Sequence, residues 1–464
     1  MMKQQVLEGE TPMMKQPGCV HCDGGRLARR DFLRVGSLGL LGIGLGQYLQ
    51  VSRALASQEL AGLAKRKANA CILLWLSGGA PQMDTFDPKP TSPFKPISTN
   101  VDGIQISDLF PRLSQHMDKL SIIRSMQTKE TNHPQGTVEV MTGHRPNAGI
   151  KCPSLSTIIC RELGPRNELP PNLVAPLPIK HSFAPYKDAY QSGFMDARYD
   201  PMFLPDPSEK DFELPDLTLP QSLTPEAIED RREFLGVVDR LFRRKEQMAE
   251  FSTLDQYTEQ ALGMLLSPNV KKAFDLTQES DETKDAYGRN KVGLSALLSR
   301  RLVEAGARFV TVTGSPKSYA DWDTHADNNK TMRESLGPVL DQTLPTLLED
   351  LKQRGLLETT VVLVMGEFGR TPDINTQAGR DHYPDCWSML LGGGGIEGGQ
   401  VIGASDEKAA HPIERPTSMG EVFATVYKAF GIDYTKTYMT PVGRPIYIAN
   451  GFEDQLGHPI PELI

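Results

Sequence analysis

Histidines and carboxylates follow several apolar stretches of this sequence in short, dense clusters. Histidine nitrogens combined with carboxylate oxygens suit zinc, manganese or iron, whereas sets made only of oxygen suit calcium or magnesium. We therefore interpret these clusters as ligands of a divalent metal ion, with zinc, calcium, magnesium and manganese as candidates. The candidate ligands, in chain order, are Asp84, Asp323, His325, Glu367 and His382, and His133 is a candidate general base or further ligand.

Each of these residues also has an ordinary structural explanation. Asp84 can cap a turn, and His382 can be a loop histidine without a ligand. Glu367 can form an ion pair with Arg370 or with Arg380. A shared site is favoured because the clusters come after successive predicted strands, and not because of any single residue.

Two other catalytic patterns do not fit the sequence. The glycine run at residues 392–395 lacks the Gly-Lys-Ser/Thr ending of a phosphate-binding loop and the spacing of a dinucleotide-binding fingerprint. The sequence also contains no Gly-x-Ser-x-Gly motif, which argues against a standard serine hydrolase.

The elements that must position the clusters are indicated by hydrophobic patterning. Continuous apolar runs are typical of strands buried on both faces of a parallel sheet, and helical patterns lie between these runs. This alternation predicts an α/β fold with a mostly parallel sheet flanked by helices on both faces. Ligands of such sheets bind beyond the carboxyl ends of the strands, where the polar clusters fall. The predicted strands are 71–76, 120–123, 308–312, 360–365 and 387–391, and the predicted helices are 136–141, 289–305, 336–351 and 419–430.

One long segment interrupts this alternation. Residues 164–222 are rich in proline, residues 225–250 have the pattern of a long charged helix, and residues 251–288 contain further helical patterns. We expect residues 164–290 to form a largely helical and irregular insertion between early and late strands of one sheet.

Composition limits the classes of function. The 464 residues include 50 Lys+Arg and 58 Asp+Glu, which gives a net charge of −8. This acidic balance argues against a nucleic-acid-binding protein, which usually has a basic face. Cys71 and Cys160 are expected to be buried free thiols, although a disulfide between Cys152 and Cys160 is compatible with the sequence.

The N-terminus has the features of an export signal. Arg29 and Arg30 precede an apolar run at residues 35–45, and Ala54-Leu55-Ala56 resembles a cleavage site. Paired arginines in this setting indicate a twin-arginine signal over residues 1–56, so that the mature chain begins near Ser57 in the periplasm or outside the cell. The alternative is an uncleaved membrane anchor, but the apolar run is shorter than the ~20 residues that a spanning helix needs. No other segment is long and apolar enough to span, so we expect no permanent membrane span in the mature chain.

Four segments carry a resemblance to a known family. Residues 74–89, Leu-Trp-Leu-Ser-Gly-Gly-Ala-Pro-Gln-Met-Asp-Thr-Phe-Asp-Pro-Lys, resemble the opening signature of the exported bacterial family called domain of unknown function 1501. Residues 367–372 (Glu-Phe-Gly-Arg-Thr-Pro) and 379–384 (Gly-Arg-Asp-His-Tyr-Pro) are similar to its second and third signatures. Residues 392–395 followed by 403–407 are similar to its fourth. The resemblance runs in order from Arg29 to the C-terminus.

This family is understood to be an outlying branch of the alkaline phosphatase and sulfatase superfamily, which hydrolyses phosphate and sulfate esters with bound metal ions. The resemblance implies an alkaline phosphatase/sulfatase-like fold over residues 57–464. This sequence departs from the superfamily pattern at two positions. A histidine occupies the position of the usual Ser, Thr or modified Cys nucleophile, and Glu-Phe replaces the usual Asp-His or Asp-Asn pair. The residues that the resemblance matches to superfamily site positions are Asp84, His133, Asp323, His325, Glu367 and His382.

The sequence thus leads to two hypotheses. In the first, the protein is an exported metal-dependent hydrolase of sulfate or phosphate esters, acting on an anionic ester or glycan, with no nucleic-acid partner. Arg145, Arg370 and Arg380 are then candidates for binding the anionic group, and a surface role at a helix end is the equal alternative for Arg145. In the second, the fold is retained in a non-catalytic exported binding or scaffold protein.

Overall fold

The computed structural model describes residues 67–146, 149–176, 187–210, 212, 263–317 and 321–464. These residues belong to one compact unit. The predicted signal at residues 1–56 and the predicted helix at 225–250 lie outside the described residues. Within the described part, no helix combines the length and the apolar character needed to cross a membrane.

A central sheet of eight strands organises the fold, in the order β12-β4-β11-β8-β1-β7-β5-β6. Neighbouring strands are parallel except around β11, which is antiparallel to both β4 and β8. This confirms the predicted mostly parallel α/β fold. The strands are β1 (Ala70–Trp75), β4 (Ser121–Met126), β5 (Asn172–Ala175), β6 (Met202–Phe203), β7 (Phe309–Thr313), β8 (Thr360–Met365), β11 (Trp387–Gly393) and β12 (Val401–Ile402).

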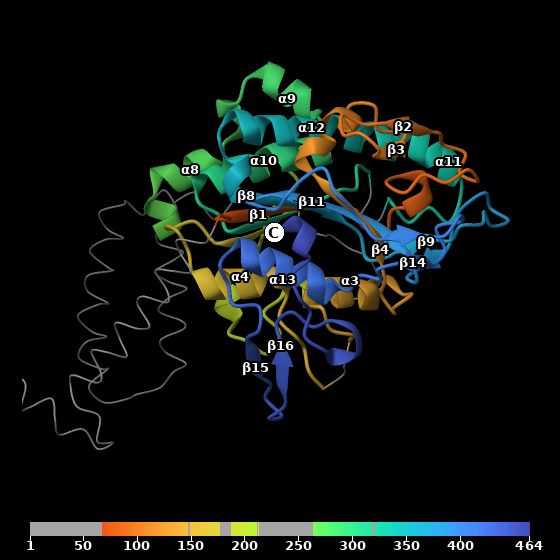
Figure 1. The fold of residues 1–464 in the computed structure, drawn as a ribbon. Helices are drawn as coiled ribbons and strands as arrows, with labels where there is room; N and C mark the ends of the chain where they lie inside the picture. Colours follow the sequence, from red (N-terminus) through yellow and green to blue (C-terminus); the bar gives the residue numbers. More distant parts are fainter. Residues whose placement is uncertain (1–66, 147–148, 177–186, 211, 213–262, 318–320) are drawn as a thin grey trace, which may run out of the picture. The chain divides into compact units, whose positions relative to one another are not determined.

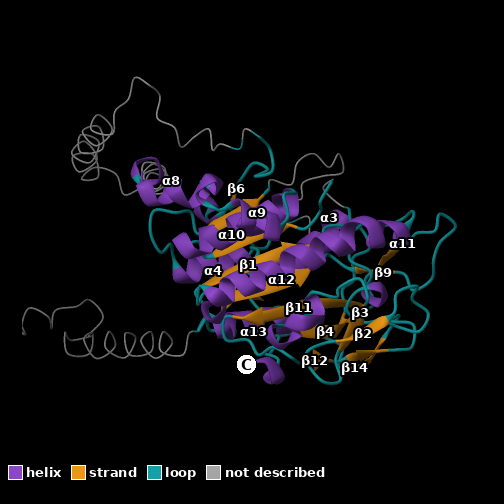
Figure 2. Ribbon diagram, turned by 90° about the horizontal axis from the view of Figure 1, so that it is seen from above, coloured by secondary structure: helices purple, strands orange, loops and turns teal. Residues whose placement is uncertain are grey.

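Helices cover both faces of the sheet. Figure 1 shows α9, α10 and α12 on one face and α3, α4 and α13 on the other, and Figure 2 shows α10 and α12 crossing over the strands. Helix α13 begins where the sequence predicts it, because Ser418 and Glu421 form a capping box. The helices are α3 (His133–Thr142), α4 (Leu155–Leu163), α5 (Lys187–Tyr190), α8 (Pro268–Phe274), α9 (Asp281–Tyr287), α10 (Lys291–Ala305), α11 (Asn328–Thr331), α12 (Gly337–Gln353) and α13 (Met419–Ala429).

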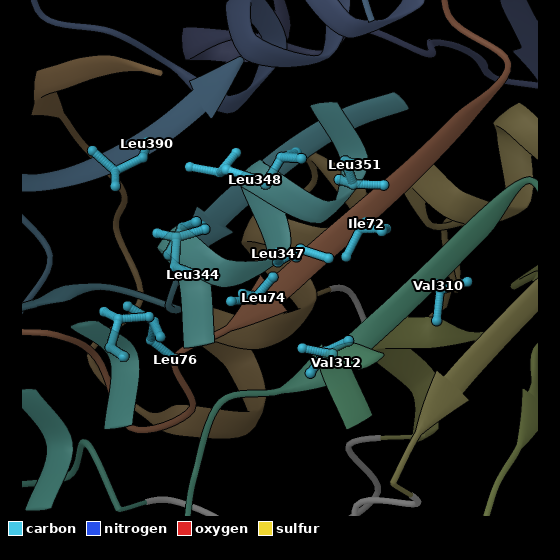
Figure 3. Packing of buried hydrophobic residues seen from close by; sticks show 14 of the residues in the cluster. Ile72, Leu74, Leu76, Val310, Val312, Leu344, Leu347, Leu348, Leu351 and Leu390 are labelled. Carbon is cyan, nitrogen blue, oxygen red and sulfur yellow. The ribbon is translucent and has the colours of Figure 1, made fainter. Parts of the chain in front are cut away.

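Strand β1 lies at the centre of two hydrophobic cores, and all six of its residues are buried. Successive side chains of a strand point to opposite faces, so Ile72 and Leu74 pack under α10 and α12, whereas Leu73 and Trp75 pack on the side of α4 and α13. Figure 3 shows the first core, in which leucines of α12 lie over β1 and β7. Each fully buried leucine contributes about 1.5–3 kcal/mol to stability.

In the described part of the chain, four short ribbons accompany the sheet, each made of two antiparallel strands. One of them, β15–β16, is the hairpin below α13 in Figure 1. The ribbons pair β2 (Pro96–Ser98) with β3 (Gln105–Ser107), β9 (Gly369–Arg370) with β10 (His382–Tyr383), β13 (Ala404–Ser405) with β14 (Pro412–Glu414), and β15 (Thr437–Met439) with β16 (Pro445–Tyr447).

The described part of segment 164–290 is mostly helical and irregular, as expected, but it also contains two short strands. It contains α8 and α9, and it supplies β5 and β6, which extend one edge of the central sheet. Strand β5 pairs in parallel with β7, with Leu173 opposite Val310. These strands were missed because they are only four and two residues long and lie in a proline-rich stretch.

The cysteines of the described residues are all free. Cys71, Cys160 and Cys386 are buried, and Cys152 is half-buried. The disulfide between Cys152 and Cys160, which the sequence left open, is therefore not formed in this structure.

Candidate metal centre

The polar clusters meet at the carboxyl edge of the sheet. The segments after β1, β4, β7 and β8 all leave the sheet there, because these strands run in the same direction. Strand β11 runs the opposite way, and its first residue, Trp387, pairs with Met126 at the end of β4. The segment before β11, which carries His382, therefore reaches the same edge.

Three histidines surround the carboxylate of Asp323. The Nε2 atom of His133 lies 3.1 Å from Oδ2 of Asp323. The Nε2 atoms of His325 and His382 each lie 3.1 Å from its Oδ1. The structure thus brings together residues from the segments after β4 and β7 and before β11.

Oxygen atoms hold the other ring nitrogen of each histidine. Nδ1 of His133 lies 2.6 Å from Oε1 of Glu367, and Nδ1 of His325 lies 2.7 Å from Oδ1 of Asp381. Nδ1 of His382 lies 2.6 Å from the backbone oxygen of Thr131. A carboxylate or carbonyl oxygen can only accept, so each Nδ1 must donate a proton. In the neutral form of each ring the unprotonated Nε2 then faces Asp323, which is the arrangement of histidines that bind metal ions.

The inward-facing atoms fit a divalent cation. Nε2 of His325 and Nε2 of His382 lie 2.9 Å apart, and two unprotonated nitrogens at that distance repel unless a proton or a cation lies beside them. Nε2 of His133 is buried and faces Oδ2 of Asp323 at 3.1 Å, but the two atoms are not aligned for a regular hydrogen bond. One ligand atom from each of His133, Asp323 and His382 lies within 4.8 Å of the others. Two imidazoles and a carboxylate suit zinc or manganese better than calcium.

The charges at this centre shift two pKa values. Burial by itself would lower the pKa of His133, but the carboxylates of Asp323 and Glu367 outweigh it and raise this pKa to about 9. Burial would raise the pKa of Asp323, but His133, His382 and Arg370 hold it far below its usual range. Without a bound cation, His133 is therefore protonated at neutral pH and is itself the positive charge between the two carboxylates.

Two glycines bring the end of β1 against this centre. The backbone N–H of Gly78 donates to both carboxylate oxygens of Glu367, at 2.9 and 3.1 Å. A Cβ atom on Gly78 would collide with the backbone nitrogen of Asp323, and Gly78 has a positive φ of 112°. Gly79 also has a positive φ, 90°, and packs against Phe368. Only glycine allows this close approach, so the Gly78-Gly79 pair positions both Glu367 and Asp323.

Arg370 positions the site and does not present an open anion-binding group. Its guanidinium is fully buried and donates to a carboxylate oxygen of Asp323 and to the backbone oxygen of Gly78. It also donates to the backbone oxygens of Gly79 at 3.2 Å and Arg380 at 3.1 Å. Burial lowers the pKa of Arg370, with Asp323 opposing that effect.

Asp84 and Arg380 are bonded to each other in this structure. The predicted metal ligand Asp84 is fully buried and forms an ion pair with the predicted anion-binding Arg380, with contacts of 2.8 and 3.1 Å. Ser92 and Asn328 donate the remaining hydrogen bonds to Asp84, at 2.7 and 2.9 Å. With these four contacts the carboxylate is saturated, and within the described part of the chain it forms no hydrogen bond or ion pair with the three histidines. Asp84 therefore holds the surrounding loops together in this structure.

Arg145 also lies apart from the histidines. Its side chain is 65% exposed and pairs with Glu130 at 2.8 Å. It lines a separate cavity of about 340 Å³, together with Asn450 and Asp454. The structure thus places Arg145 on the surface beyond the end of α3, which was the equal alternative for this residue.

Sequence reasoning missed two residues of the centre. Asp381 anchors His325, and the ring of Phe368 lies 5.1 Å from the His133 ring and 4.7 Å from the His382 ring. Both residues stand directly beside predicted ligands in the sequence, at Glu367-Phe368 and Asp381-His382. That adjacency was the available signal, although it does not show which way each side chain points.

Fold and centre together define an α/β protein with a histidine–carboxylate cluster at the carboxyl edge of its sheet. The sequence profile of the family described as "Protein of unknown function (DUF1501)" matches residues 68–464. The chain therefore belongs to this family, as the sequence resemblance predicted. The search of curated proteins found no match.

Several solved structures resemble the chain at low similarity. The alkaline phosphatase from the Antarctic bacterium TAB5 is 15% identical, with a TM-score of 0.35 over 73% of this chain and 95% of that one. The lipoteichoic acid synthase LtaP from Listeria monocytogenes is 10% identical, with a TM-score of 0.37 over 80% of this chain and 73% of that one. The C-terminal periplasmic domain of EcEptC from Escherichia coli, in complex with Zn, is 11% identical, with a TM-score of 0.37 over 86% of this chain and 92% of that one. Similarity at this level carries no argument about the activity of this chain.

Proposed function

We propose that this protein is a metal-dependent hydrolase of phosphate or sulfate esters, in which His133, Asp323 and His382 hold a divalent cation. The supporting observation is the orientation of the histidines. All three Nε2 atoms face one carboxylate, while each Nδ1 is fixed by an oxygen acceptor. Such fixing of the outer ring nitrogen raises the basicity of a metal-binding histidine.

The residues around the proposed cation have separate tasks. A divalent ion held here would polarise an ester oxygen and lower the pKa of water. Glu367 and the Thr131 carbonyl fix the rings of His133 and His382. His325 is the most exposed of the three histidines, at 40%, and its Nδ1 is fixed by Asp381. His325 is therefore placed to transfer a proton to or from a substrate that arrives from solvent.

The choice of ester rests on sequence resemblance. The four signature segments resemble a family placed in the alkaline phosphatase and sulfatase superfamily, and those enzymes cleave phosphate and sulfate esters. Among the described residues, no Ser, Thr or Cys side chain forms a hydrogen bond with the rings of His133, His325 or His382. We therefore propose that water attacks the ester directly and that no covalent intermediate forms on the protein.

Metal analysis combined with hydrolysis assays tests this proposal. The purified protein, stripped with a chelator and reloaded with zinc or manganese, should retain close to one ion per chain after desalting. It should then hydrolyse p-nitrophenyl phosphate or p-nitrophenyl sulfate. His382→Ala should lose both the ion and the activity, whereas His458→Ala, an exposed histidine outside the cluster, should keep both. Retention of the ion by His382→Ala would contradict the proposed centre.

A non-catalytic binding role is the second candidate, and the arginines favour it. Arg370 and Arg380 are buried and bonded to protein groups, and Arg145 pairs with Glu130. None of these three presents an open guanidinium to a substrate at the centre. A protein that binds one ion but leaves both esters intact would support this second role and contradict the first.

We also propose that the protein is exported by the twin-arginine route and cleaved near Ser57. The support is the Arg29-Arg30 pair with the apolar run and Ala54-Leu55-Ala56 site that follow it. N-terminal sequencing of the protein recovered from the producing cell tests the cleavage. An intact Met1 on exported protein would contradict it.

A further inference from the structure

A second cavity, of about 460 Å³, lies away from the histidine cluster. It is formed by the last turn of α4, the segment 194–199 and the hairpin β15–β16, which Figure 1 shows below α13. None of the residues that surround Asp323 lines it. Its volume falls within the ~300–1,000 Å³ that is typical of small-molecule sites. We propose that this cavity binds an oxyanion, such as a carboxylate, sulfate or phosphate group, carried on a ligand about the size of one ring.

Arg161 is the residue that would bind the anion. Its guanidinium carbon lies 4.3 Å from the centre of the Tyr438 ring, so the planar group is stacked on an aromatic face. Its hydrogen bond in this structure goes from Nη1 to the Met195 sulfur at 3.3 Å, and a thioether is a weak acceptor. Arg161 forms no ion pair with a carboxylate among the described residues. Most of its donors therefore remain available in a fixed, fork-shaped group.

Among the described residues around the cavity, Arg161 is the cation that has no carboxylate partner. Asp196, which also lines the cavity, pairs with Arg198 at 2.6 Å. Glu162, the residue next to Arg161, accepts hydrogen bonds from Lys436 and from the hydroxyl of Tyr438. Both nearby carboxylates are thus bound to other groups. The Tyr438 hydrogen bond also fixes the ring on which Arg161 is stacked, so the guanidinium is held in place before a ligand arrives.

The other residues that line the cavity indicate which uncharged group the ligand carries besides its oxyanion. Phe194, Tyr199 and Tyr438 supply aromatic rings, and Met439 supplies an apolar edge that is 64% exposed. A bare inorganic anion would leave these surfaces uncovered. An oxyanion attached to a ring of sugar or aromatic size would contact them while its charge meets Arg161. This inference does not depend on the proposed hydrolase activity, because the cavity shares no residue with the metal centre.

Titration calorimetry with four related sugars tests the inference. Glucose 6-phosphate, glucose 6-sulfate and glucuronate carry different oxyanions on one ring, and glucose is the uncharged control. At least one of the three anions should bind the purified protein at least about tenfold more tightly than glucose, since a charge-assisted hydrogen bond is worth more than a neutral one. The order among the three identifies the preferred oxyanion. Equal or absent binding of all four would overturn the proposal.

Variants of Arg161 test whether the anion binds in this cavity. Arg161→Gln should weaken binding of the preferred anion at least about tenfold, and Arg161→Lys should give an intermediate loss because it keeps the charge without the fork. Arg333→Gln is the matched control, because Arg333 is also stacked on an aromatic ring, that of Phe94 at 5.0 Å, but lies outside the cavity. Arg161 is exposed, so both of its variants should fold normally, as circular dichroism would show. Unchanged binding by Arg161→Gln would overturn the assignment.

Discussion

The proton on His133 should decide how pH affects both the stability of the protein and its affinity for metal. His133 lies between two carboxylates, 2.6 Å from Glu367 and 3.1 Å from Asp323, and its pKa is raised to about 9. In an unfolded chain a histidine has a pKa near 6.5. The folded protein therefore holds this proton more tightly than the unfolded chain does.

The size and sign of the stability effect follow from this difference. A shift of about 2.5 units at ~1.36 kcal/mol per unit corresponds to about 3 kcal/mol at most. Because the folded pKa is the higher one, this stabilisation is fully present below about pH 6.5 and is lost as the pH rises through about 9. The free energy of unfolding of the metal-free protein should therefore fall by up to about 3 kcal/mol over that window.

Metal binding should have the opposite pH dependence. A cation on Nε2 must displace the proton of His133, so the affinity should rise with pH up to about 9, by up to about tenfold per pH unit for this one proton. Calorimetric titrations of zinc in buffers with different ionisation enthalpies measure the protons released. At pH 7 at least one proton should leave for each ion bound.

Glu367→Gln measures how much the Glu367 carboxylate contributes to the raised pKa of His133. Glutamine keeps the shape but removes a negative charge from beside Nδ1, so the pKa of His133 should fall by at least about one unit and metal affinity should drop about 10–100-fold. NMR titration of the labelled, metal-free protein gives the pKa directly. Glu130→Gln, which changes an ion pair with exposed Arg145, is the control and should leave the pKa unchanged. A His133 pKa near 6.5 in the parent, or one unaffected by Glu367→Gln, would refute this reasoning.

Three further predictions concern the rest of the structure. Arg380→Gln leaves the buried Asp84 carboxylate without its cation, so urea unfolding should show a loss of about 3–5 kcal/mol, while the metal content measured by mass spectrometry stays at the parent level. Gly79→Ala should lower the free energy of unfolding by about 2 kcal/mol or more, because the new Cβ would lie 2.7 Å from the backbone oxygen of Phe368. Gly103→Ala, which also has a positive φ but no atom within 4 Å, should cost less. Of the four thiols after residue 57, only that of Cys152 should react with Ellman's reagent in the native protein, since the other three are buried.

The sequence predicted the centre of the sheet better than its edges. Strands β1, β7 and β8 are buried on both faces and therefore consist of continuous apolar runs, which hydrophobicity alone reveals. Strands β5 and β6 lie at an edge and are short, so they leave a weak pattern. The reversed direction of β11 leaves no pattern at all, because an apolar run reads the same for either direction of pairing.

The candidate site shows a similar division. Placement after successive strands predicted that six residues would gather at one edge: Asp84, His133, Asp323, His325, Glu367 and His382. The structure brings the last five together, whereas Asp84 bonds to Ser92, Asn328 and Arg380 instead. Placement did not predict that Asp84 pairs with Arg380, which is 296 residues away in the chain. An aspartate at a strand end can bind a metal ion, cap a turn or pair with an arginine. Only the positions of the surrounding loops determine which of these occurs.

Under the proposed hydrolase function, the charge of the centre would allow it to bind an anionic ester although its arginines are occupied. In the metal-free protein the positive charges beside Asp323 and Glu367 are Arg370 and the protonated His133. A divalent cation that displaces this one proton adds two charges and removes one, so the centre gains one positive charge in a largely buried setting. Arg370 keeps Asp323 in place throughout, because its guanidinium is bonded to backbone oxygens on β1's exit loop as well. Under the proposed function, a bound ion, and not a free arginine, would attract the substrate.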